Sequence, residues 1–340
     1  MQMFFTALLR CSAAMSVISI VYMAAMPRLS KRYSAKWLYY IWLVVVIGWL
    51  FPFRPHFDTN LFPFQMLKLQ MIQTAYSGVN EPLTVITNHT SAALSIPLWW
   101  VIASIWAIGV VGIIAYNAWR HGQFLKMVKR WSEDITDPWT INVLDTLRTE
   151  MKIGRHISLK FCPGIASPMM IGFFRPVILL PSIKIASDEL TLILKHEFVH
   201  LQRHDLWYKA LVLLTTAVHW FNPVVHIMAK AIAVQCEISC DELLLKETCL
   251  QHRRQYGETL IGVVRNSGKL QTALSTDFYR AGKGIQTRIF YIMDTTKKKA
   301  GITILCVALI AIMGSGMAIA SGSEVIENNN AAMQAERELI

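Results

Sequence analysis

Residues 196–200 are His-Glu-Phe-Val-His, a spacing that suits a catalytic zinc site. On an α-helix of about 3.6 residues per turn, His196 and His200 lie one turn apart on one face, so both imidazoles can reach one metal ion. Glu197 lies beside them, where its carboxylate can act as a general base on the water that attacks a peptide carbonyl. The motif predicts an endopeptidase with one catalytic Zn²⁺ ion; the alternative is an exposed helix with two unrelated histidines.

A catalytic zinc ion takes three protein ligands and keeps one position for water, so a third ligand must lie elsewhere. A metzincin would have a further histidine six positions after His200, where this chain has Leu206, and the inverted HxxEH motif is absent. A carboxylate from a later helix remains, and Glu237 and Asp241 lie one turn apart on one helical face. We predict that Glu237 binds zinc and that Asp241 accepts a hydrogen bond from the second ring nitrogen of a ligand histidine. The alternative is an ordinary acidic helix surface.

Residues 187–205 are predicted to form the helix that carries the motif. Ser187 suits the N-cap position, and Asp188 and Glu189 favour the positive end of the helix dipole. Apolar residues recur at helical spacing before the motif: Leu190, Ile193 and Leu194. This apolar face would hold the motif against the rest of the domain.

Two strands are predicted before this helix, at residues 157–161 and 169–180, because both segments are rich in branched and aromatic side chains. Pro163-Gly164 and Pro181 bound them. A strand directly before an HExxH helix offers an edge to which an extended substrate could add through main-chain hydrogen bonds. The alternative is that these strands only cover the domain.

The stretch 206–234 is apolar, but it carries polar side chains at a density that is costly in hydrocarbon. They are Lys209, His219, Asn222, His226 and Lys230. We predict two buried helices that break near Asn222-Pro223 and graze the inner leaflet. His219 could donate to the oxyanion of the tetrahedral intermediate, or it could be a structural histidine in a buried helix.

The composition predicts an integral membrane protein, because 54% of the residues are hydrophobic and only 16% are charged. Four apolar runs are long enough to cross a membrane: 4–25, 37–53, 98–116 and 301–320. The first run lacks a basic leader and ends in Met26-Pro27-Arg28, so we predict a retained span and not a signal peptide.

Basic residues predict the orientation of these spans. The short first connection carries Arg28, Lys31, Arg32 and Lys36, whereas the long second connection, 54–96, carries only Arg54 and Lys68. This asymmetry predicts a multi-pass membrane protein with the N-terminus outside and 117–299 in the cytoplasm. Anionic lipid head groups account for the net charge of +11, and no helix-turn-helix or zinc-finger pattern points to direct binding of nucleic acid.

The six cysteines are Cys11, Cys162, Cys236, Cys240, Cys249 and Cys306. Four of them lie in the predicted cytoplasmic region, where thiols stay reduced. Cys236 and Cys240 flank Glu237, but structural zinc sites usually use closer CxxC pairs. We therefore predict that both are packing residues.

Three separate motifs resemble the BlaR/MecR family of membrane-bound metallopeptidases, metallopeptidase family 56. They are 196–200 with Arg203 and Asp205, then His-Trp-Phe-Asn-Pro at 219–223, and then 237–241. Residues 167–172 and 175–181 also resemble the family's strand region before the zinc helix. The resemblance implies a gluzincin-like zinc endopeptidase of the bacterial plasma membrane that faces the cytoplasm, is held by four spans and responds to an external signal. It also implies that Asp205 supports a ligand histidine.

The expected organisation is a mainly α membrane protein with three spans in 1–116 and an α+β metallopeptidase domain at 117–300. The fourth span follows at 301–320, and 321–340 is a short, polar, extracellular tail. Sensors of the family carry a penicillin-binding-like domain after the fourth span, and the tail has no acylable SxxK word. We therefore expect no such sensor in this chain, either because it is truncated or because a partner, the outer loop or the membrane supplies the signal.

The resemblance further implies what is cut, since its better-known members sense β-lactams, cleave themselves and bring about loss of a cytoplasmic repressor. The expected partners are membrane lipid, a cytoplasmic repressor or another protein substrate, and the chain itself. Ser-Thr-Asp-Phe-Tyr at 275–279 is a candidate self-cleavage site. Two other classes stay open: a general quality-control protease with the same site, and a non-enzymatic scaffold whose zinc motif is vestigial.

Overall fold

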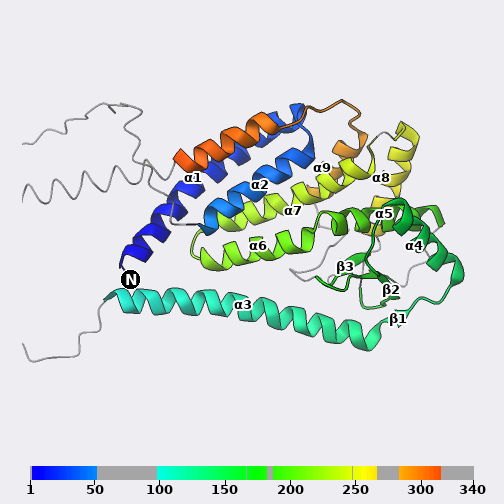
Figure 1. Ribbon diagram of the computed structural model, residues 1–340, viewed down its shortest axis with the longest axis horizontal. Coiled ribbons are helices and arrows are strands. Elements are labelled where there is room, and N and C mark those ends of the chain that lie inside the picture. Colours follow the sequence, from blue (N-terminus) through cyan, green and yellow to red (C-terminus); the bar gives the residue numbers. More distant parts are fainter. Residues whose placement is uncertain are drawn as a thin grey trace, which may run out of the picture.

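The computed structural model describes residues 2–51, 98–165, 167–181, 187–246, 248–265 and 283–314. These residues are mainly helical, as predicted. Figure 1 shows a long helical bundle that carries a smaller, sheet-containing part at one end. The candidate self-cleavage segment 275–279 and the tail 321–340 lie outside the described residues.

The bundle consists of long apolar helices. They are α1 (Gln2–Arg32), α2 (Ala35–Leu50), α3 (Leu98–Trp131), α6 (Asp205–Val218), α7 (Pro223–Leu244) and the helix Ile302–Gly314. Of these, α1, α3 and α7 are long and apolar enough to cross a membrane, and α2 and Ile302–Gly314 are shorter apolar helices. Each of the four predicted spans thus overlaps an apolar helix, although 52–53 of the second span and 315–320 of the fourth lie outside the described residues. The number of spans stays a prediction.

The helices α6 and α7 form a hairpin that runs beside α2. The chain breaks at Asn222-Pro223 as predicted, where the Asn222 side chain accepts a hydrogen bond from the backbone N–H of Val224 and caps α7. One end of α6 contacts α2 through Tyr208 and Tyr39, whose rings lie 4.6 Å apart. At the other end of α6, His219 contacts the carbonyl of Trp49 on α2. His219 lies eleven residues after Tyr208, which is about 16 Å along the helix axis.

The return helix α7 runs back along α1 and α2. Asn222 donates to the hydroxyls of Ser12 and Ser16 on α1, and Gln235 donates to the carbonyl of Ala35 at the start of α2. These contacts confirm two helices that break near Asn222-Pro223, whereas the contact of this stretch with the inner leaflet stays a prediction. The hairpin extends along almost the whole of α2, because its polar side chains find partners on neighbouring helices (Figure 1).

Two basic segments meet at one end of the bundle. The backbone N–H of Lys299 donates to the carbonyl of Arg32 at 2.9 Å, and Ser34 donates to the carbonyl of Lys299 at 3.0 Å. We call this region, formed by residues 28–36 and 297–299, the basic end. It is the end of the bundle from which the sheet-containing part projects (Figure 1).

The small sheet has the strand order β1-β2-β4-β3. Its strands are β1 (Glu133–Asp134), β2 (Ser158–Phe161), β3 (Met169–Ile171) and β4 (Val177–Leu180). β2 and β4 are parallel, whereas β1 and β3 pair antiparallel to their neighbours. β4, the strand directly before the HExxH helix, is therefore internal, so the predicted substrate edge can belong only to β3 or β1.

The prediction of one continuous strand over 169–180 was wrong, because the chain turns back between β3 and β4. Gly172 has φ +90, a conformation that L side chains rarely adopt. A Cβ at this position would also meet the carbonyl oxygen of Arg175. The turn brings the exposed Phe174 to the surface next to the bundle.

The HExxH helix α5 (Ser187–Gln202) packs on the sheet. Leu190, Ile193 and Phe198 share one buried cluster with Ile178 and Leu180 of β4 and its neighbours. The helix ends three residues before the predicted 205, because His204 has φ +58. This reversal starts α6 at residue 205. Residues 182–186 lie outside the described part of the chain, so the predicted N-cap at Ser187 is untested.

Three further helices complete the described structure. α4 (Pro138–Glu150) covers α5 and is capped by Asp137, which accepts from the backbone N–H of Thr140. α8 (Leu250–Arg265) and α9 (Lys283–Met293) pack together, and α9 also contacts α7. α8 and α9 therefore close the side of the site that faces away from the sheet (Figure 1).

Candidate metal centre

α5 and α7 bring three of the candidate ligands together next to the basic end. The Nε2 atoms of His196 and His200 lie 3.1 Å apart. Glu237 places Oε2 3.4 Å from Nε2 of His196 and Oε1 3.7 Å from Nε2 of His200. All three side chains are buried, and one donor atom from each lies within 4.8 Å of the others. The spacing seen in the sequence thus directs both imidazoles to one point.

The neighbours of these groups leave lone pairs facing that point. Nδ1 of His200 lies 2.7 Å from Oδ2 of Asp205, a carboxylate that can only accept, so in the neutral ring that binds a metal Nδ1 carries the hydrogen and Nε2 the lone pair. Oε2 of Glu237 is buried and has no hydrogen-bond partner among the described residues. Burial opposes the charged imidazole, but the Glu237 charge together with the hydrogen bonds to Asp205, Cys236 and Glu237 outweighs burial and holds the pKa of His200 well above its ordinary value, so the site favours a positive charge. The lone pairs of these ligand atoms and the negative charge of Glu237 fit a cation. A set of imidazole nitrogens and a carboxylate oxygen suits Zn²⁺.

Glu197 follows His196 directly on α5, and its side chain is fully buried. It is not one of the grouped candidate ligands, and consecutive helix residues project about 100° apart. This position on the helix suits a base that acts on water at the metal.

Asp205 holds the first imidazole in place. Its Oδ2 accepts from Nδ1 of His200, and its Oδ1 accepts a 3.0 Å hydrogen bond from the hydroxyl of Tyr39 on α2. The Arg203 guanidinium lies 3.5 Å from the same Oδ1 and 4.3 Å from the centre of the Tyr39 ring. His204 has a left-handed backbone conformation, which reverses the chain after α5. The Asp205 side chain can therefore contact His200 on α5. Asp205 thus lies where the resemblance predicts it.

Asp241 holds the second imidazole mainly through Tyr256. The Tyr256 hydroxyl donates to Oδ1 of Asp241 at 2.6 Å and lies 2.9 Å from Nδ1 of His196, whereas Asp241 itself is 3.4 Å from that nitrogen. Burial, together with the Asp241 charge, holds the pKa of Tyr256 well above its ordinary value, so the phenol keeps its hydrogen. The predicted partner of the ligand histidine is present, with a tyrosine between them.

Arg288 on α9 completes this arrangement. Its Nε donates to Oδ2 of Asp241 at 2.7 Å and its NH2 to Oδ1 at 2.8 Å, a two-bond contact between a guanidinium and a carboxylate. Its NH1 also lies 3.5 Å from Oε2 of Glu237. Sequence reasoning identified neither Arg288 nor Tyr256. Both lie on helices far along the chain and carry no motif spacing; the only available signal was that a buried Asp241 needs a cationic partner.

Tyr256→Phe is expected to weaken zinc binding roughly tenfold, because a lost partner of a ligand histidine costs about 10- to 100-fold in metal affinity. Competition with a zinc chelator would measure the change. Tyr291→Phe on α9 is the matched control, since the described contacts of its ring are with Phe290 and not with the site. Equal zinc affinity in the two variants would show that Tyr256 does not orient His196.

The prediction that Cys236 and Cys240 only pack was incomplete. Sγ of Cys236 lies 3.4 Å from Oδ2 of Asp205, and Sγ of Cys240 lies 3.3 Å from Nδ1 of His200. These four residues form a second set of possible metal ligands. However, the guanidinium of Arg203 lies 3.0 Å from the Cys240 sulfur, and a cation there disfavours a divalent ion. The set containing Glu237 is therefore the better candidate.

His219 lies far from these groups. It caps the other end of α6, where its Nε2 donates to the carbonyl of Trp49 at 2.9 Å. Fourteen residues of helix, or about 21 Å, separate it from Asp205, which contacts His200. This position does not fit an oxyanion donor at the metal centre and favours the structural alternative.

His219→Phe is expected to lower the thermal unfolding midpoint and to leave kcat within about twofold of the native value. The change leaves the Trp49 carbonyl without its donor, a loss of about 1–3 kcal/mol for a buried group. Loss of an oxyanion donor would instead lower kcat by about 10²- to 10³-fold. Parallel unfolding and kinetic measurements separate the two outcomes.

The metal centre lies level with the first turn of α2. Tyr39, which contacts Asp205, is the fifth residue of that helix. Glu242, directly after Asp241, accepts from the hydroxyl of Ser34 and from the backbone N–H of Lys36. If α2 crosses a membrane, the centre therefore lies at the membrane surface on the side of the basic end.

These features define a helical protein with apolar, membrane-compatible helices and a buried donor set suited to a metal. The model of the BlaR1 peptidase M56 family matches residues 6–292, so the chain belongs to this family of metallopeptidases. It is 24% identical over 278 residues to the regulatory protein BlaR1 of Bacillus licheniformis, which covers 75% of this chain and 45% of that protein. It is also 24% identical over 239 residues to the methicillin resistance mecR1 protein of Staphylococcus aureus strain Mu50. That alignment covers 65% of this chain and 40% of that protein.

The regulatory protein BlaR1 of Staphylococcus aureus is 21% identical over 315 residues, or 88% of this chain and 53% of that protein. The chain thus spans about half the length of the curated relatives it matches. The relatives support a membrane-bound regulatory protein of a peptidase family.

Proposed function

We propose that the chain is a zinc-dependent endopeptidase with His196, His200 and Glu237 as ligands and Glu197 as the general base. The observation that carries this proposal is the convergence of two imidazole Nε2 atoms and a carboxylate on one buried point. Zinc held there would lower the pKa of water and polarise the scissile carbonyl.

The protein's own groups then have separate tasks. Glu197 takes a proton from the attacking water and delivers it to the leaving amine. Asp205 fixes the ring of His200, and Tyr256 with Asp241 fixes the ring of His196, so both Nε2 lone pairs stay aimed at one point. Their burial keeps competing water away and strengthens these contacts.

The proposed topology has four spans, formed by α1, α2, α3 and the helix that begins at Ile302. The basic end then faces the cytoplasm, because residues 28–36 and 297–299 concentrate positive charge there. This orientation puts the N-terminus outside and the metal centre at the cytoplasmic surface of the membrane.

The substrates that we propose are the chain itself and a cytoplasmic repressor, so that cleavage transmits a signal. The support is that the relatives are named as regulatory and resistance proteins. Residues 275–279 lie between α8 and α9, and Arg288 of α9 contacts Asp241. A cut there would leave α9 joined to the metal centre only by packing and hydrogen bonds.

The proposed function can be tested by N-terminal sequencing of fragments from bacteria that express the native chain or its Glu197→Gln variant. We expect a small set of fragments, one starting within 275–279, together with loss of an intact repressor, and none of these in the variant. Degradation of many misfolded membrane proteins would instead indicate a quality-control protease. Identical fragments from both chains would contradict any protease function.

A further inference from the structure

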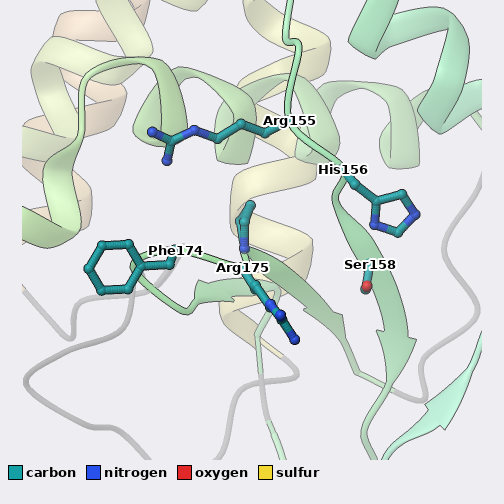
Figure 2. A pocket seen from close by; sticks show the side chains of 6 residues that line it. Arg155, His156, Ser158, Phe174 and Arg175 are labelled. Carbon is teal, nitrogen blue, oxygen red and sulfur yellow. The ribbon is translucent and has the colours of Figure 1, made fainter.

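A pocket of about 510 Å³ lies at the end of the sheet where β2 and β4 begin. Its lining residues are Arg155, His156, Ser158, Phe174, Arg175 and Pro176. Figure 2 shows Arg155 and His156 on the segment before β2, and Phe174 and Arg175 on the connection between β3 and β4. None of the lining residues is acidic.

The charge of this pocket is available to a ligand. Arg155 and Arg175 are exposed, and neither forms an ion pair with another residue in the described ranges. His156 adds an imidazole and Ser158 a hydroxyl that can donate. Two guanidinium groups with a nearby hydroxyl favour a phosphate-like anion.

The pocket lies beside two exposed aromatic side chains. Phe174 is 80% exposed and its ring centre lies 5.5 Å from that of Trp207, which is itself 48% exposed. Phe173 contacts the same indole at 4.9 Å. Large exposed aromatic side chains next to arginine are typical of the interface between water and a lipid bilayer.

The depth of these aromatic side chains along the bundle can be read from their contacts. Trp207 precedes Tyr208, whose ring lies 4.6 Å from Tyr39 in the first turns of α2. Lys36 and the rest of the basic end lie one turn before Tyr39. The tip of the β3–β4 hairpin is therefore level with the basic end of the bundle, where a membrane spanned by α2 would present its head groups.

We propose that this pocket binds the phosphate of an anionic phospholipid, with Phe174 and Trp207 in the boundary between head groups and acyl chains. Arg155, on the segment before β2, and Arg175, on the connection after β3, would supply the positive charge that attracts the phosphate. The lipid would thereby fasten the sheet, on which the HExxH helix packs, to the membrane surface. This proposal depends on α2 being a span, but not on proteolysis.

A lipid fits these observations better than a soluble anion or an acidic peptide. A free phosphate would use the two arginines but gives no reason for the exposed aromatic side chains. An acidic peptide could use both, but it does not require the pocket to be level with the basic end. The anionic lipid accounts for the charge, the aromatic side chains and the depth together.

The test is native mass spectrometry of the full chain in detergent, titrated with phosphatidylglycerol and separately with phosphatidylcholine. The double variant Arg155→Gln/Arg175→Gln is compared with the control Arg148→Gln/Arg254→Gln, which removes the same charge from arginines that pair with acidic neighbours on α4 and α8. We expect phosphatidylglycerol binding to weaken about 30-fold in the pocket variant, since each of the two arginines contributes roughly 1 kcal/mol at a lipid surface. The control should change less than about twofold.

Phe174→Ser supplies a second arm that leaves the charge intact. It should weaken phosphatidylglycerol binding and leave binding of soluble glycerol phosphate unchanged. Equal weakening in the pocket and control variants would overturn the proposal in favour of diffuse attraction. Glycerol phosphate binding as tight as the lipid would indicate a soluble ligand, and a raised KM for acidic peptides with unchanged lipid binding would indicate a substrate site. Zinc content is measured in every variant and should stay native, which keeps this test separate from that of the protease.

Discussion

Glu197→Gln is expected to bind zinc as the native chain does and to lose proteolysis, with the cleavage rate falling roughly 10²- to 10⁴-fold. The amide keeps the size of the carboxylate but cannot accept the proton of the attacking water. Glu197 is not among the grouped candidate ligands, which is the reason why the metal should remain. Zinc content and cleavage of a peptide or of the chain itself are measured on the same preparation.

Glu189→Gln is the matched control, because it makes the same change in the first turn of the same helix α5. We expect this variant to keep both zinc and activity. If Glu197→Gln still cleaves at the native rate, Glu197 is not the base. If it loses zinc together with activity, its carboxylate belongs among the ligands and the assignment of Glu237 must be reconsidered.

Glu237→Gln is expected to reduce zinc affinity by more than the 10- to 100-fold that is usual for a partner of a ligand, because it removes a ligand itself. The neutral amide also leaves the cation less compensated in a buried site. Chelator competition measures the affinity, and activity should fall in proportion to the zinc that is lost.

Glu242→Gln provides the comparison for this change on the same helix. Its carboxylate accepts from Ser34 and Lys36 at the basic end and is not among the candidate ligands. Native zinc affinity in Glu237→Gln, or an equal loss in both variants, would contradict the role of Glu237. A loss in Glu242→Gln alone would point to the basic end as the origin of the effect.

The residues of the site that share a helix could be predicted from their spacing in the sequence. His196, Glu197 and His200 are fixed by the geometry of a single helix, and Glu237 and Asp241 follow from a one-turn spacing on another. Tyr256 and Arg288 could not be found in this way. They reach Asp241 only because α8 and α9 fold against α7, and such tertiary contacts leave no periodic pattern in the sequence.

The fold shows the same division between local and long-range information. The break at Asn222-Pro223 is local, and it was predicted from a proline that cannot continue a helix. The course of the α6–α7 hairpin along α1 and α2 was not predicted, because it depends on the partners that Asn222 and Gln235 find on those helices. The turn at Gly172 was missed because the apolar residues on both sides of it look like one strand.

The role of His219 was open for a related reason. A histidine in an apolar stretch is compatible with catalysis and with structure, and its residue type does not distinguish them. The direction of α6 distinguishes the catalytic role from the structural one, because this helix places His219 beside Trp49 and away from the metal centre. The direction of a helix in a bundle comes from packing and not from its own composition.

The most direct test of the metal centre is X-ray absorption spectroscopy of the zinc-loaded full chain, because the two candidate donor sets differ in sulfur. The account predicts one zinc per chain with nitrogen and oxygen ligands only, at about 2.0–2.2 Å. A sulfur shell at about 2.3 Å would place the ion with Cys236 and Cys240, beside His200 and Asp205, and would contradict the assignment of His196, His200 and Glu237.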